Sequence, residues 1–245
     1  MKKSKNYDQR KFNLITPPAA ILAVGAVIFY GLTASEAPIV AALMSDPWVS
    51  FEKIMSRSIY EGGAFGGSDV GVTCAILCFL VWIARRGANS EVLYFSRQEF
   101  KFVWLASLTT SIILVHSLKW IISRVRPKLF FSTTSAMSLE NANLESLRWP
   151  GFLSFNAPRG IGWNSFPSGH TASSAILLCF AYIFYRKNRA LGLGIGMGVF
   201  LYCVAMSIAR SMAGMHWLTD GVASFFGVWA IIHEISVRMK IHSSK

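Results

Sequence analysis

The sequence predicts an all-α protein, a bundle of six transmembrane helices with a long outward loop between the third and fourth helices. Of its 245 residues, 53% are hydrophobic, and the mean hydropathy is +0.44. Only 15% are charged, whereas soluble domains carry about a quarter. Several apolar runs approach the roughly 20 residues that a helix needs to cross a bilayer. We therefore expect one integral membrane domain over residues 1–245.

Six apolar runs carry this prediction. The first follows a basic N-terminal tail and is longer than the apolar region of a typical signal peptide, so we expect it to be retained as a helix. The fifth contains four glycines at alternate positions, a pattern that suits close helix packing. The expected spans are about Leu14–Thr33, Val70–Ala84, Phe102–Ile122, Thr171–Tyr185, Leu191–Ile208 and Leu218–Ile235.

The connections between these runs predict the orientation in the membrane. More than half of the 24 Lys and Arg residues lie in the N-terminal tail, after the second and fourth runs, and in the C-terminal tail. Such basic segments stay on the cytoplasmic side, so we expect both termini there. The first connection, 34–69, is acidic, and we expect it outside, partly as an amphipathic helix along the interface. The third, 123–166, also faces outward, and its length is typical of a functional loop.

Two other features of the composition exclude function classes. The formal net charge is +12, but the basic residues lie mostly between apolar runs and form no nucleic-acid-binding motif, so we expect no nucleic-acid partner. The four cysteines fall inside apolar runs without the spacing of zinc ligands, so we expect buried side chains and no metal site. The glycine cluster 62–67 lacks the lysine of a P-loop, and we interpret it as a flexible turn.

A loop that turns into a helix carries the first functional signal. Pro167, Ser168, Gly169 and His170 stand directly before an apolar run. Proline suits the first helical turn, and we expect the amides of the following residues to be free. Free amides at a helix N-terminus bind anions, and His170 adds a group that exchanges protons near neutral pH. An ordinary helix start is the simpler interpretation of this cluster taken alone.

Three cations are expected at the same outward end of the bundle. Lys119 and Arg126 lie at the exit of the third run, and Arg210 lies near the end of the fifth. Arginine holds phosphate oxygens bidentately and lysine adds a point charge. Each alone would be an anchor whose charge reaches the membrane surface. Their joint occurrence near His170 favours a site for a phosphate group, because charges this close to lipid are usually functional.

A second histidine supplies the chemistry that the cations lack. His216 and Asp220 are four residues apart, which places them on one side of a helix if the segment is helical. A carboxylate on one imidazole nitrogen fixes the tautomer and leaves the other nitrogen free to attack phosphorus. His170 then protonates the leaving oxygen and later activates water, while the cations stabilise the transferring group. The alternative for the pair alone is a helix cap.

The three clusters together resemble the signature of the type 2 phosphatidic acid phosphatase (PAP2) superfamily, which includes the vanadium haloperoxidases. Its pattern is K-x6-R-P, then P-S-G-H, then S-R-x5-H-x3-D. The first two parts are complete in 119–127 and 167–170, and in the third Ala209 replaces the serine. The replacement removes a hydroxyl near the phosphate but no residue with a chemical step. The signature lies within residues 119–220, under half of the chain.

The resemblance implies a six-helix bacterial lipid phosphatase of the inner membrane, with its active site facing the periplasm and no cofactor or metal. It implies His216 as the nucleophile, Asp220 as its partner and His170 as the general acid and base. The implied phosphate contacts are Lys119, Arg126, Ser168, Gly169 and Arg210.

The predicted function is hydrolysis of a lipid phosphate monoester or diphosphate through a phosphohistidine. Lipid A or undecaprenyl diphosphate is favoured, because the long third connection carries Arg148 and Arg159; phosphatidylglycerophosphate and phosphatidate remain candidates. Two alternatives stay open, namely transfer of phosphate between lipids and binding or transport of a phosphate lipid without catalysis. The sequence does not predict the oligomeric state.

Overall fold

The computed structural model describes residues 18–46, 48–56, 67–85, 95–136, 151–152 and 162–241. Their elements are α1 (Pro18–Thr33), α2 (Glu36–Ser45), α3 (Val49–Ser56), α4 (Gly67–Ala84), α5 (Arg97–Thr109), the π-helix η3 (Thr110–Ser117), α6 (Leu118–Ile121), β1 (Ile122–Ser123), α7 (Pro127–Ala136), β2 (Gly151–Phe152), α9 (Gly169–Ala175), α10 (Leu178–Lys187), α11 (Arg189–Met212) and α12 (Leu218–Arg238). The prediction of a helical bundle is confirmed for this part of the chain.

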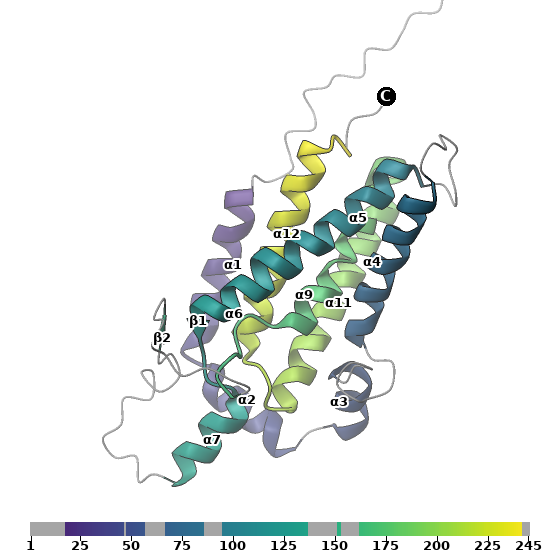
Figure 1. Cartoon of the computed structure of the whole chain (residues 1–245). Helices are drawn as coiled ribbons and strands as arrows, with labels where there is room; N and C mark the ends of the chain where they lie inside the picture. Colours follow the sequence, from purple (N-terminus) through teal and green to yellow (C-terminus); the bar gives the residue numbers. More distant parts are fainter. Residues whose placement is uncertain are drawn as a thin grey trace, which may run out of the picture.

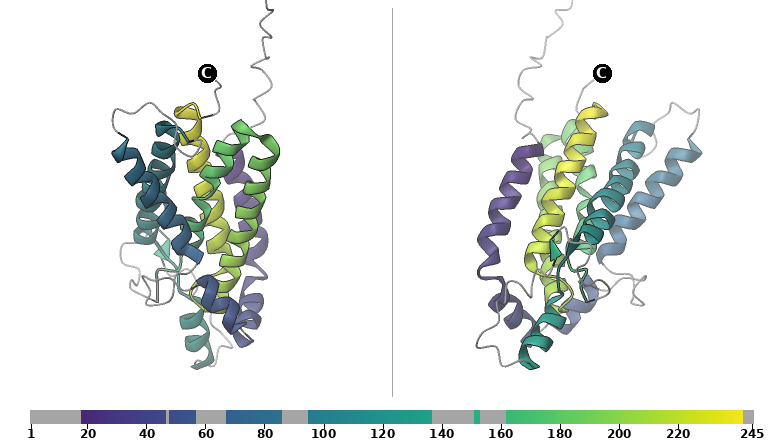
Figure 2. Two further views of the ribbon diagram at one scale, coloured as in Figure 1. Left: turned by 90° about the vertical axis from the view of Figure 1, so that its right-hand side faces the viewer. Right: turned by 60° about the vertical axis from the view of Figure 1, so that its left-hand side comes forward.

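The long helices lie side by side, and the short elements gather at one end of them (Figure 1). In Figures 1 and 2 the start of α1 and the end of α12 share the upper end of the bundle. The opposite end carries α2, α3, α7 and the β1–β2 pair. This arrangement agrees with an even number of crossings, while the side of the membrane on which each end lies stays a prediction.

The number of membrane crossings is established only in part. Among the described residues, three helical segments are long and apolar enough to span: Arg97–Ile121, Arg189–Met212 and Leu218–Arg238. A fourth candidate is α1 together with α2, which meet at a bend of 70°. The apolar stretch Asp69–Ala84 is shorter than a typical span. Six spans therefore remain a prediction.

The expected fourth span is interrupted in the structure. Instead of one helix over 171–185, α9 ends at Ala175 and α10 begins at Leu178. The amides of Ile176 and Leu177 donate to the carbonyls three residues earlier, at 3.3 and 3.2 Å. Bonds of this spacing tighten the helix into a 3₁₀-like turn, so two short helices replace the expected continuous one.

The glycines of α11 only partly fulfil the prediction of close packing. A Cβ on Gly192 would overlap the backbone of Tyr185 in α10, so α10 and α11 approach closely there. Gly194 and Gly198 would meet no described atom within 4 Å. The reason is geometric, because residues two apart point to nearly opposite sides of a helix with 3.6 residues per turn. The even spacing therefore serves the packing of one side only.

Two hydrophobic cores support the bundle. The larger one runs through α4, α5 and α9 to α12 and includes Phe102, Ile183 and Ile232. The smaller one lies at the end with the short elements and joins Val40 of α2, Val125 and Phe130 to Trp217. Because Trp217 follows His216 directly, this second core fixes the segment that carries the predicted nucleophile.

Candidate active site

Backbone hydrogen bonds bring the three predicted clusters together. The amide of Arg124 donates to the Trp163 carbonyl at 3.0 Å, and the amide of Ser165 donates to the Arg124 carbonyl at 3.1 Å. This parallel bridge places the segment after Lys119 beside the segment before His170. The Ser168 amide then donates to the Asp220 carbonyl at 3.4 Å, which joins the second cluster to the third.

His216 lies in the turn between α11 and α12 and is 2% exposed. Its Nδ1 is 2.5 Å from the Ser165 carbonyl oxygen and 3.5 Å from Asp220 Oδ2. A carbonyl only accepts hydrogen bonds, so Nδ1 carries the proton and Nε2 carries the lone pair. Sequence reasoning expected Asp220 as the partner of the ring; the structure adds the Ser165 carbonyl as the nearer acceptor.

Asp220 is held from several sides and is fully buried. Its Oδ1 accepts from Arg124 Nη1 at 2.5 Å. Its Oδ2 accepts from the Ser165 hydroxyl at 2.5 Å and from the Trp217 amide at 3.0 Å. Sequence reasoning did not single out Arg124 or Ser165, although each lies next to a predicted cluster.

The surroundings of His216 keep its ring neutral. Burial lowers the pKa of His216 to about 3, and the nearby positive charges of Arg210 and Lys119 act in the same direction. The hydrogen bond and the charge of Asp220 oppose this shift. A neutral imidazole is the nucleophilic form, so the lowered pKa agrees with the role predicted for His216.

The predicted cations lie around this histidine, each with a protein acceptor. Lys119 Nζ donates to the Asn164 carbonyl at 3.2 Å, and Arg126 Nη2 donates to the Asn164 side-chain oxygen at 3.1 Å. Arg210 is 3% exposed and donates to the Ser56 carbonyl at the end of α3, at 2.8 Å. Asn164 and Ser56 are therefore part of the site, although no motif in the sequence marked Ser56.

The start of α9 differs from the prediction in two respects. Pro167 lies before the helix instead of in its first turn, and Ser168 is the N-cap, with its hydroxyl accepting from the Thr171 amide at 3.4 Å. The Ser168 amide is not free, because it donates to Asp220. Of the expected phosphate contacts here, the Gly169 amide is thus the better candidate. Half-buried His170 occupies the first turn.

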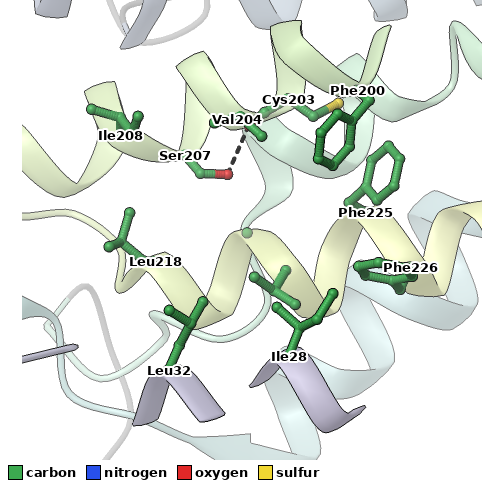
Figure 3. A pocket seen from close by; sticks show the side chains of 12 residues that line it. Ile28, Leu32, Phe200, Cys203, Val204, Ser207, Ile208, Leu218, Phe225 and Phe226 are labelled. Atoms are coloured by element: carbon green, nitrogen blue, oxygen red, sulfur yellow. Dashed lines mark hydrogen bonds between the residues drawn. The ribbon is translucent and has the colours of Figure 1, made fainter. Parts of the chain in front are cut away.

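An apolar cavity of about 330 Å³ opens between α1, α11 and α12. Figure 3 shows Ile28 and Leu32 of α1 together with Val204 and Phe225 among the side chains that line it. The cavity reaches Gly221, which directly follows Asp220. Ser207 lines it and donates its hydroxyl to the Cys203 carbonyl at 2.8 Å (Figure 3). Hydrocarbon would therefore fit this cavity better than a polar ligand.

Some residues fall outside the described part of the chain or away from the site. Residues 62–66 of the glycine cluster, Arg148 and Arg159 are outside the part of the chain that the structure describes, whereas Gly67 of this cluster begins α4 instead of lying in a turn. His233 is buried near the other end of α12, where its ring contacts the Tyr182 hydroxyl at 3.2 Å. Among the described residues, no group of three His, Cys, Asp or Glu side chains is arranged to hold a metal ion.

The fold and the site define a helical membrane protein with a buried histidine–aspartate pair surrounded by cations. The model of the PAP2 superfamily matches residues 100–241, more than half of the chain, and the chain belongs to this superfamily. A search of curated proteins finds no match.

The fold is similar to the crystal structure of a transmembrane PAP2-type phosphatidylglycerolphosphate phosphatase from Bacillus subtilis. The TM-score is 0.50 at 14% sequence identity, and the match covers 91% of this chain and 96% of that chain. At this identity the likeness concerns the fold alone.

Proposed function

We propose that this protein is a membrane phosphatase that removes phosphate from a lipid through a phosphohistidine on His216. The observation that carries the proposal is the geometry of the His216 ring. The ring is buried and neutral, and its Nδ1 holds the proton that it donates to the Ser165 carbonyl. Nε2 is thereby left as the nucleophile. The arrangement resembles the logic of a catalytic triad, in which a buried carboxylate orients an imidazole.

The proposed reaction has two steps. His216 Nε2 attacks phosphorus, the bond from phosphorus to the lipid oxygen breaks, and His170 gives its proton to the leaving oxygen. His170 then takes a proton from water, which attacks the phosphohistidine and releases inorganic phosphate. Lys119, Arg126 and Arg210 stabilise the charge on the transferring group in both steps. Because α9 has only seven residues, we assign most of this stabilisation to the cations.

The apolar cavity supports a lipid as the substrate, because apolar side chains of α1, α11 and α12 line it and it reaches Gly221, the residue after Asp220. We propose lipid A or undecaprenyl diphosphate first, and phosphatidylglycerophosphate or phosphatidate next, at the periplasmic side of a bacterial inner membrane. A Val204→Trp substitution, which fills the cavity, should reduce turnover of a long-chain lipid phosphate and spare a short-chain one.

The test is release of inorganic phosphate from these four lipids by purified protein in detergent. Wild-type protein should turn over at least one of them, and His216→Ala should not. His116→Ala is the matched control, since His116 is exposed and bonded within its own helix to the Ser111 carbonyl. Lack of turnover by the wild type, or full activity of His216→Ala, would reject the proposal.

The same assay with labelled phosphate separates the two alternatives. Label that appears on an acceptor lipid instead of in water would indicate a phosphotransferase. Label that binds equally to wild type and His216→Ala, with no product from either, would indicate a binder or transporter.

A further inference from the structure

A buried network of charges lies behind the histidine–aspartate pair. Glu36, Arg124 and Asp220 are each fully buried. Arg124 Nη1 is 2.5 Å from Asp220 Oδ1, and its Nη2 is 2.9 Å from Glu36 Oε2. A guanidinium remains charged at every physiological pH, and a buried charge is tolerated only with good partners. The two carboxylates provide these partners on two edges of one guanidinium.

Glu36 is fixed by a second contact. Its Oε1 accepts from the Thr219 amide at 2.5 Å, within the first turn of α12. This position satisfies an amide that the helix leaves unpaired, and it suits a carboxylate because the N-terminus of a helix is partially positive. Glu36 is thus attached both to α12 and to Arg124, although it comes from α2 at the other end of the sequence.

Arg124 is also fixed independently of Asp220. Its backbone forms the parallel bridge to the segment 163–165. Its guanidinium lies over the Trp217 ring, 5.3 Å from the ring centre, and donates to the Thr219 hydroxyl at 2.7 Å. A side chain held at so many points has little freedom to rotate, so it presents Nη1 to Asp220 in one orientation.

We infer that Arg124 and Glu36 are positioning residues, which together hold Asp220, and through it Ser165 and His216, in the reactive arrangement. The consequence is that α2 forms part of the active-site support. Glu36 lies outside residues 100–241, which the PAP2 model matches, so this contact extends the site beyond the region that defines the superfamily. The kinetic part of the inference rests on the proposed function; the spectroscopic part does not.

The charged groups around His216 act on its pKa in opposite directions. Asp220 of α12 raises it, whereas Arg210 from α11 and Lys119 from α6 lower it. Glu36→Gln removes the negative charge behind Arg124 and leaves the guanidinium with one carboxylate. Arg124→Gln removes the donor to Asp220 and leaves two carboxylates without their cation. Arg124→Lys keeps the charge but cannot bridge both carboxylates with one planar group.

The kinetic experiment measures phosphate release by full-length protein in detergent. We expect Glu36→Gln and Arg124→Lys to lower kcat about ten- to hundredfold, the usual cost of losing an outer partner of a reactive group. KM should change by less than about threefold, because the phosphate contacts stay in place. Binding of inorganic phosphate should likewise persist, which separates mispositioning from loss of the fold.

Two control variants come from the other end of the bundle. Arg97→Lys changes an arginine that lies over Trp82, 5.2 Å from the ring centre, as Arg124 lies over Trp217. Glu99→Gln changes a carboxylate that is 2% exposed. Both should retain kcat within about twofold of the wild type.

The spectroscopic experiment does not depend on turnover. Protein labelled with 15N in histidine should show His216 with its proton on Nδ1, and Arg124→Gln should shift or broaden that resonance because Asp220 and Ser165 lose their fixed partner. Unchanged His216 resonances in Arg124→Gln, or kcat of Glu36→Gln within twofold of the wild type, would overturn the inference. A wild type without turnover would reject only the proposed function, and the resonances would still decide this one.

Discussion

The two ends of the bundle each bury a carboxylate, and they satisfy it in different ways. At one end Glu99 forms a capping box with Ser96, whose amide donates to Glu99 at 2.6 Å. Its cationic neighbours Arg186 and Lys187 stand 4.0 and 3.8 Å away and remain partly exposed. At the other end Asp220 pairs at 2.5 Å with a fully buried arginine and accepts from Ser165 and Trp217.

The difference separates a carboxylate whose hydrogen bond is local from one that also binds distant segments beside the proposed nucleophile. Glu99 Oε2 accepts from the Ser96 amide within its own helix turn, and its other charged neighbours, Arg186 and Lys187, stand farther away. Asp220 also accepts from the Trp217 amide within its own helix start, but its other two partners, Arg124 and Ser165, come from distant segments, and its remaining neighbour is the ring of His216. A buried carboxylate whose hydrogen-bond partners come from distant segments indicates a functional site better than burial alone does.

The comparison is tested most severely by neutralising each carboxylate with its isosteric amide. We expect Asp220→Asn to lower kcat by about a hundred- to ten-thousandfold, because the amide changes the hydrogen bonding that sets the ring orientation. Glu99→Gln should stay within twofold of the wild type in the same phosphate-release assay. Comparable losses in both variants would show that the two ends do not differ in function.

The arginines at the two ends provide the next test. Arg126→Lys should reduce kcat/KM about ten- to a hundredfold, because lysine cannot hold two phosphate oxygens with a planar group. Arg97→Lys should leave kcat/KM unchanged, since Arg97 donates to the Trp82 carbonyl, away from the predicted clusters. Steady-state kinetics on one lipid phosphate measures both, and equal effects would contradict the assignment of Arg126.

The stability of the folded protein should also depend on pH through His216, at the end of the bundle that carries the candidate site. The folded protein holds the pKa of His216 at about 3, below the unfolded value of about 6.5. The stability from this neutral ring is therefore complete above pH 6.5 and falls as the pH drops toward 3. Between pH 6.5 and 5 the wild type should lose about 2 kcal/mol that His216→Gln does not lose.

Chemical denaturation in detergent at the two pH values measures this difference, with His116→Gln as the control that should follow the wild type. In the same pH range kcat/KM should show no acid limb near 6.5 from the nucleophile. An equal loss of stability in wild type and His216→Gln would contradict the conclusion that the buried His216 ring is neutral.

The smallest effect is expected from the ion pairs of Glu99. Glutamine at position 99 keeps the capping box, because it also accepts from the Ser96 amide. Only the attraction to two partly exposed cations is lost, so the free energy of unfolding should fall by about 1 kcal/mol or less. A small decrease in the melting temperature measures this loss. A larger fall would mean that this end of the bundle depends on its charges as the site does.

Much of the candidate site was predictable from the sequence, because the proposed reactive residues lie in short motifs. Pro167–His170 and the spacing of His216 and Asp220 are local patterns, and the structure brings them together with Lys119 and Arg126. The contributions of Ser165, Asn164 and Ser56 were not predictable, because a backbone carbonyl or an amide side chain shows its role only once another segment lies against it.

Apolar runs and motif spacings are properties of neighbouring residues, so they were enough to predict a helical membrane protein and the residue types for phosphoryl chemistry. The break between α9 and α10, the cap made by Ser168 and the pairing of Glu36 with Arg124 became visible only in the folded chain. Glu36 and Asp220 are far apart along the chain, and no local pattern links them. They share Arg124 because α2 turns by 70° after α1, where α2 and α12 pack beside the second core around Trp217.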